Sequence, residues 1–185
     1  MTYYGGKEMA VSFRTVRNNT VKIAEDIPEN KYDFRAAPDC RTIGQTLVHI
    51  ALGTGFQLYV QTNKIDDLKK VNFAELFQKF GAEEAQPRTK AEIVGMLKRE
   101  GEKYASFLES STEDFFTEHV AMPPGGDTPA KTRFEMLLSP KEHEMHHRAQ
   151  LMVLQRMIGQ VPHLTRQMQE RVAQMQAAAA AQQAR

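Results

Sequence analysis

Apolar residues recur every three or four positions in several long segments of this chain, and this spacing restricts the fold more than any other feature. The first stripe consists of Met9, Phe13, Val16, Thr20, Ile23 and Ile27. Such spacing places apolar side chains on one face of a helix. Similar stripes follow further along, and no segment of useful length alternates as a strand would. The sequence therefore predicts an all-α protein, most simply a four-helix bundle.

Capping residues predict where the later helices begin. Thr42 is a candidate N-cap for a second helix that runs over about 43–62. Thr89 followed by Glu92 forms a capping box that opens the third helix, which ends near residue 110. Between these helices lies a long polar connection with one short periodic piece, "FAELFQKF", which we expect to form a short helix.

Proline and glycine interrupt the last part of the bundle. The stretch "HVAMPPGGDTPAKT", residues 119–132, has three prolines and two glycines, so we expect it to lack regular structure. The fourth helix begins near Thr132. Pro140 lies well inside that helix, and its ring and missing N–H should kink the helix or restart it with Ser139 as a new cap.

The C-terminal stretch differs in composition from the rest. Residues 165–185 are rich in Ala and Gln, with Met168, Val172, Met175 and Ala179 at heptad-like spacing. We interpret residues 1–164 as the bundle and residues 165–185 as an appended helix or tail. That tail is either a solvated, partly frayed helix or a surface for self-association, and the second reading predicts a homodimer.

Charge and cysteine content exclude several classes of function. Lys and Arg number 24 against 23 for Asp and Glu, so the net charge of +1 gives no general attraction to nucleic acid or anionic lipid. No apolar run approaches the roughly 20 residues of a membrane span, and no signal peptide is evident. A single cysteine, Cys40, excludes an intramolecular disulfide and an all-cysteine metal site. We expect a cytoplasmic protein.

Histidine is the remaining soft ligand, and "PKEHEMHHRAQL", residues 140–151, carries three of the six histidines. On a helix, His143 and His147 lie on one face, and their line continues through Leu151 and Leu154 towards the core. The alternative pair, His143 with His146, also has helical neighbour spacing, and its line continues through Gln150, Val153 and Met157. Periodicity prefers His147 only modestly.

A firmly held metal needs a third protein ligand from a facing helix. His49 lies on an otherwise apolar helix, "TIGQTLVHIALGTGF", whereas His119 and His163 sit beside proline-rich or helix-terminal segments. His49 is therefore the better third ligand. The main rival is a hydrogen-bonded structural network, since buried imidazoles need partners of some kind.

The segments "RTIGQTLVHI" and "FEMLLSPKEHEMHHRAQLMVLQRMIGQVP" resemble the DinB-like (YfiT-type) four-helix-bundle family, and the resemblance covers roughly residues 9–163. It implies that His49, His143 and His147 bind a divalent metal. Zinc or nickel suits imidazole ligands best. Ala149 stands where that family often has glycine, which leaves these ligands untouched.

The resemblance also implies an activity, because relatives in this family include bacillithiol S-transferases and mycothiol-dependent maleylpyruvate isomerase. We expect a metal-dependent enzyme that activates water or a low-molecular-weight thiol towards a small electrophile. A non-enzymatic metal-binding stress-response protein and a dimeric interaction module are the alternatives. The near-neutral charge argues against nucleic-acid binding.

Several neighbours of these histidines are candidates for positioning a ligand or contacting a substrate: Gln45, Gly53, Glu142, His146 and Arg148. Gln45 could orient an imidazole or bond to the backbone, and Gly53 could permit close helix packing or leave room for a ligand. Glu144 and Arg148, four residues apart, are most simply a solvated ion pair. No residue is evident as a general base.

Overall fold

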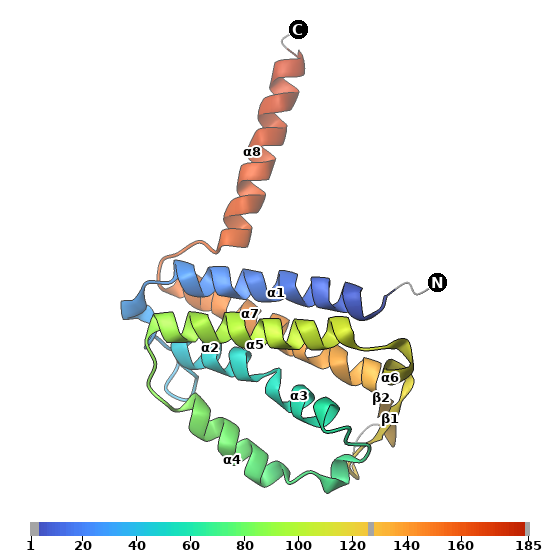
Figure 1. Ribbon diagram of the computed structural model, residues 1–185. Helices are drawn as coiled ribbons and strands as arrows, with labels where there is room; N and C mark the ends of the chain where they lie inside the picture. Colours follow the sequence, from blue (N-terminus) through green and yellow to red (C-terminus); the bar gives the residue numbers. More distant parts are fainter. Residues whose placement is uncertain (1–3, 126–127, 184–185) are drawn as a thin grey trace.

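The computed structural model describes residues 4–125 and 128–183, and within them four helical segments form a bundle (Figure 1). These segments are α1 (Gly6–Asp26), the pair α2 (Ile43–Leu52) and α3 (Gly55–Thr62), α5 (Lys90–Ser110) and α7 (Arg133–Met157). Both α1 and α2 pack against α5 and α7, so the four surround a shared core. The prediction of an all-α four-helix bundle is confirmed.

The predicted helix starts are also confirmed. Thr42 accepts a hydrogen bond from the backbone N–H of Gln45 at 3.1 Å, and the Gln45 side chain accepts one from the Thr42 N–H at 2.9 Å. Thr89 and Glu92 form the same box at the start of α5. Thr132 caps α7. These caps satisfy N–H groups that have no partner within the helix.

The second helix is not the single element predicted over residues 43–62. It ends at Leu52, and α3 begins at Gly55. Two glycines within three residues each cost about 1 kcal/mol of helix propensity relative to alanine, which weakens the helix at this point. The expectation of one continuous helix was therefore wrong at Gly53 and Thr54.

The restart expected in the last bundle helix does not occur, because α7 runs unbroken from Arg133 to Met157 with Pro140 inside it. The proline is buried. The hydroxyl of Tyr104 on α5 donates a hydrogen bond to the Leu137 carbonyl at 2.6 Å. The Leu137 carbonyl, which lies in the turn that Pro140 disturbs, therefore has a hydrogen-bond partner on another helix. Packing therefore compensates for a residue that breaks an isolated helix.

Residues 119–132 contain a short hairpin, where no regular structure was expected. Strand β1 (His119–Ala121) pairs antiparallel with β2 (Ala130–Thr132), with Val120 opposite Lys131. Val120 is fully buried and packs in a small cluster with Val60 and Met136. Pro123, Pro124, Gly125 and Pro129 lie between the strands and outside their pairing, so the strands themselves are free to pair.

Shorter elements connect the bundle helices. These are η1 (Glu29–Lys31), η2 (Leu68–Lys70), α4 (Phe73–Glu84) and α6 (Glu113–Thr117). Helix α4 confirms the short helix expected in the long connection. It has no buried residue, yet it packs against α2. Its last residue, Glu84, thereby reaches the candidate site.

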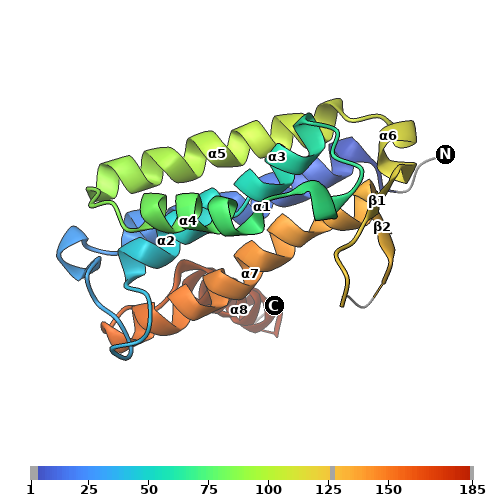
Figure 2. The same cartoon turned by 90° about the horizontal axis from the view of Figure 1, so that it is seen from below.

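Helix α8 (His163–Gln183) projects away from the bundle in Figure 1, and in Figure 2 it is seen nearly end-on behind α7. Its start is attached to α1: His163 is buried, and Arg166 forms an ion pair with Asp26 at 2.7 Å. The residues that follow are exposed. The division at residue 165 and the homodimer stay predictions. No helix in the described part of the chain is long and apolar enough to cross a membrane.

Candidate metal centre

Helices α2 and α7 bring His49, His143 and His147 together, and we refer to them as the three-histidine cluster. One ligand nitrogen from each lies within 4.8 Å of the other two. The Nε2 atoms of His49 and His143 are 3.0 Å apart. Two imidazole nitrogens on one tetrahedral zinc lie about 3.3 Å apart, given Zn–N bonds of about 2.05 Å. The observed spacing is a few tenths of an ångström shorter.

The core-facing stripe of α7 accounts for the choice of histidines. Leu151 and Leu154 are buried, whereas Val153 is 57% exposed. His143 and His147 share the face of the two leucines, and His146 is exposed. The preference for His147 over His146 therefore agrees with the observed orientation of the helix.

The outer nitrogens of two of these rings have acceptor partners. His49 Nδ1 lies 2.9 Å from Glu84 Oε2, and His147 Nδ1 lies 2.8 Å from Gln150 Oε1. Because a carboxylate and an amide oxygen only accept, each Nδ1 carries the proton and donates it. The lone pair of each ring is then on Nε2. Histidines that bind metals are oriented in this way.

The cluster is neutral at pH 7. Burial lowers the pKa of His143 to about 4, and the nearby His147 and His49 add to the effect. Burial also lowers the pKa of His49 and of His147, although Glu84 and Gln150 respectively oppose it. Neutral imidazole is the form that binds a metal. The donor set therefore fits a divalent cation without first losing protons.

Gly53 leaves space for one of these rings. A Cβ atom at this position would lie 2.8 Å from His143 Nδ1 and 3.0 Å from its Cε1. The sequence suggested that Gly53 permits close helix packing or leaves room for a ligand above the metal, and neither explanation includes this contact with His143. The missing side chain makes room for the His143 imidazole itself.

Comparison with known proteins places these observations in a family. The sequence profile of the DinB superfamily matches residues 12–151, which include all three histidines. The chain belongs to the DinB superfamily. A search of curated proteins gave no match.

Solved structures share the fold of this DinB-superfamily chain. A DinB-like protein from Bacillus subtilis is 23% identical, with a TM-score of 0.61 over 83% of this chain and 94% of its own. One from Bacillus cereus is 17% identical, with a TM-score of 0.64 over 84% and 93%. Bacillus subtilis YfiT, described as a probable metal-dependent hydrolase with an unusual four-helix bundle topology, is 14% identical, with a TM-score of 0.64 over 86% and 91%.

The remaining candidates lie around the cluster in different settings. Gln45 takes the backbone alternative, since its side chain bonds to the Thr42 N–H. His146 is exposed and lies 3.1 Å from Gln150 Nε2. Glu142 is exposed. Arg148 is partly buried. Burial lowers the pKa of His163 at the start of α8, and the charge of Arg148 is one of the further causes.

The predicted ion pair between Glu144 and Arg148 was wrong. Glu144 is 1% exposed and pairs with Arg17 of α1, with Nη2 and Oε2 2.9 Å apart. Arg17 also donates to the carbonyl oxygens of Leu97 at 2.7 Å and Ile50 at 3.3 Å. These bonds join α7 to α1, α5 and α2 one residue from His143. They hold the helix in the rotation that turns both histidines towards α2.

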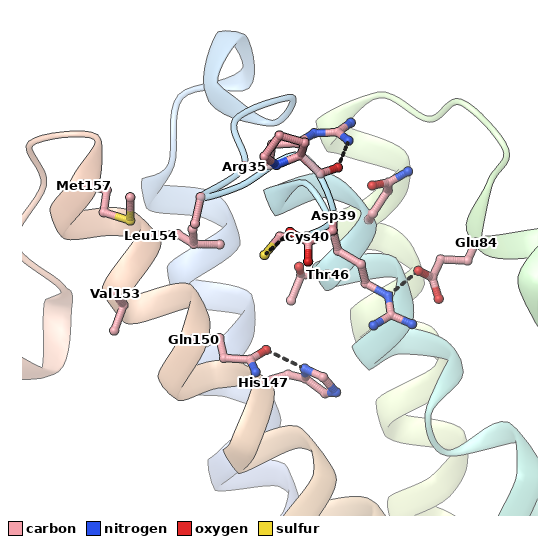
Figure 3. Close-up of a pocket in the computed structure, with 14 residues that line it drawn as sticks. Arg35, Asp39, Cys40, Thr46, Glu84, His147, Gln150, Val153, Leu154 and Met157 are labelled. Carbon is pink, nitrogen blue, oxygen red and sulfur yellow. Dashed lines mark hydrogen bonds and ion pairs between the residues drawn. The ribbon is translucent and has the colours of Figure 1, made fainter.

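A pocket of about 830 Å³ opens beside the cluster (Figure 3). We call it the lateral pocket; it is lined by parts of residues 35–46, by Glu84, and by α7 between His147 and Met157. Glu84 lies across the pocket from α7. Its carboxylate accepts a hydrogen bond from Arg41 Nε as well as the one from His49. Glu84, Arg41 and Gln150 were not predicted from the sequence.

Proposed function

We propose that this DinB-superfamily protein binds one divalent ion through His49, His143 and His147. The ion would serve to activate water or a low-molecular-weight thiol towards a small electrophile. Three protein ligands leave coordination positions open, as in catalytic rather than structural sites. A bound divalent ion lowers the pKa of such a nucleophile towards neutrality. Zinc or nickel fits an all-imidazole donor set.

One observation carries this proposal: the outer nitrogens of His49 and His147 are bound to Glu84 and Gln150, so their Nε2 lone pairs are left for a cation. In a purely hydrogen-bonded network, His49 and His143 would satisfy each other at 3.0 Å. The structure shows no hydrogen-bond acceptor or donor for His147 Nε2 within the described residues. A cation bound by one nitrogen of each ring would give all three imidazoles a partner.

The chain's own residues supply orientation and access. Glu84 fixes the tautomer and ring angle of His49, and its second oxygen is held by Arg41. Gln150 does the same for His147. The lateral pocket gives a small molecule a route to His147. The similarity in fold to YfiT, a probable metal-dependent hydrolase, supports the hydrolase form of the proposal, and the resemblance to thiol transferases supports the thiol form.

The test is a turnover screen with metal-loaded, tag-free protein. Water, bacillithiol, mycothiol and glutathione are offered with model electrophiles to the wild type, to His49→Ala and to His146→Ala. We expect metal-dependent turnover that His49→Ala abolishes and His146→Ala retains, since His146 is exposed on the same helix. Absence of turnover with every nucleophile would favour the non-enzymatic alternative. Equal turnover in wild type and His49→Ala would contradict the assignment of His49.

A further inference from the structure

Two arginines, Arg35 and Arg41, line the lateral pocket, and the proposed metal chemistry gives their guanidinium groups no role towards a substrate. Arg41 holds Glu84 through Nε alone. Its two terminal amino groups have no acceptor in the part of the chain that the structure describes, and 44% of the side chain is exposed. A guanidinium has five N–H donors, so most of them remain available to a ligand.

Arg41 is also close to the cluster. Glu84 connects them, because one of its carboxylate oxygens accepts a hydrogen bond from Arg41 Nε and the other accepts one from His49 Nδ1. A ligand bound to the terminal amino groups of Arg41 would therefore lie next to the metal ligands.

Arg35 lines the same pocket from the loop before α2. Its Nη1 donates to the Pro38 carbonyl at 3.3 Å, which fixes the side chain towards the loop (Figure 3). Its other N–H groups have no acceptor among the residues described. Two arginines with unfilled donors thus line one cavity, although they come from different positions in the loop.

Two carboxylates in the lining of the pocket offset these charges. Glu84 is shared between His49 and Arg41, and Asp39 forms an ion pair with neither arginine within the described chain. The lining is therefore balanced in formal charge until a divalent cation binds. A bound divalent cation would make the electrostatic potential in the pocket positive. Apolar side chains in the pocket wall would strengthen its attraction for an anion, because they screen charge less than water does.

The opposite wall of the pocket is apolar and belongs to α7. Val153 is 57% exposed and Met157 is 52% exposed, and buried Leu154 lies between them (Figure 3). An organic ligand would cover these side chains. A cavity of about 830 Å³ falls within the roughly 300–1,000 Å³ of small-molecule sites, which combine apolar walls with a few polar groups.

We infer that the lateral pocket binds a small organic anion. Its carboxylate lies on Arg41 and Arg35, and its apolar body lies against Val153, Leu154 and Met157. Guanidinium groups match a carboxylate with paired, charge-assisted hydrogen bonds. As a statement about the enzyme's substrate class, this inference rests on the proposed function. As a statement about binding, it can be tested without any turnover.

The test compares 4-phenylbutyrate with 4-phenyl-1-butanol, which share an apolar body and differ in the charged group. Titration calorimetry on the zinc-loaded full chain should show the carboxylate binding about tenfold more tightly, the effect of one charge-assisted pair. Arg35→Gln should remove most of this preference while zinc content stays the same, because Arg35 contacts neither the histidines nor Glu84. Val153→Ser should weaken both probes alike.

Arg99→Gln is the matched control, since Arg99 is an exposed arginine on α5 outside the pocket. Equal affinity of wild type for the two probes would overturn the anion class. A preference that survives Arg35→Gln and disappears only when zinc is removed would assign the carboxylate to the metal, and would overturn the role of the arginines. Absence of turnover would contradict the proposed function. It would not change the measured preference for the carboxylate over the alcohol, so the two claims are tested separately.

Discussion

Replacing Gly53 with alanine adds a single carbon atom next to His143, and it therefore tests whether the geometry of the three-histidine cluster matters for metal binding. The backbone at Gly53 is in the right-handed helical region, with φ −59° and ψ −22°, so alanine fits it without strain. The new Cβ would lie 2.8 Å from His143 Nδ1, whereas ordinary contact begins near 3.4 Å. The imidazole must therefore retreat by about 0.6 Å at that atom.

That movement is small for the fold and large for a metal ligand. A ligand nitrogen is held to within about 0.2 Å in a working site, so the His143 bond would be lost or lengthened. We expect metal affinity to fall about 10- to 100-fold, the range seen when the support of a ligand is disturbed. The free energy of unfolding should change little, because alanine restricts the unfolded chain more than glycine does, and this gain of about 0.4–1 kcal/mol offsets the displaced ring.

The assay is competition with a chromogenic chelator, with urea denaturation measured on the same samples. Gly95→Ala is the matched control, since a Cβ at that position in α5 meets nothing within 4 Å. It should bind metal as the wild type does and gain about 0.5–1 kcal/mol of stability. If Gly53→Ala binds metal as tightly as Gly95→Ala, the contact with His143 does not matter for the site and the reasoning fails.

Three further outcomes are expected. Glu84→Gln should weaken metal binding about tenfold in the same competition assay, because an amide orients His49 less strongly than a carboxylate; unchanged affinity would remove Glu84 from the site. Arg17→Met should cost about 3–5 kcal/mol in urea denaturation, since it leaves Glu144 buried without its cation; a loss below about 1 kcal/mol would show that the pair is dispensable. The metal-free protein should lose stability on acidification: the pKa of His143 is about 4 when folded and 6.5 as a free side chain, so the unfolded chain binds more protons below pH 6.5. Melting temperatures that stay constant or rise between pH 7 and pH 5 would contradict this.

Helical periodicity was sufficient to predict the bundle, and it favoured His147 over His146 on α7 only modestly. His143, His147 and Leu151 recur every four residues; Leu151 is buried in the core and both histidines are half-buried. His49 could be chosen because it is the histidine of an apolar helix. Local sequence therefore indicates that these histidines face the interior of the bundle, since each lies on a stripe that has to face the core.

The partners of those histidines were not predictable in the same way. Glu84 reaches His49 across 35 residues from a short polar helix, and no local pattern marks it. Glu144 pairs with Arg17 across 127 residues, although Arg148 stands one turn away. Sequence spacing favours the local ion pair, and burial of Glu144 decides against it. A signal was available only for Gln150, three residues after His147.

The metal content of the purified protein tests the proposed centre most directly. Tag-free wild type, His49→Ala and His146→Ala are incubated with zinc, dialysed and analysed by elemental mass spectrometry. If the cluster holds a cation, wild type and His146→Ala each carry close to one zinc ion per chain, and His49→Ala loses most of it. Equal zinc in wild type and His49→Ala, or none in the wild type, would contradict the assignment of a metal to His49, His143 and His147.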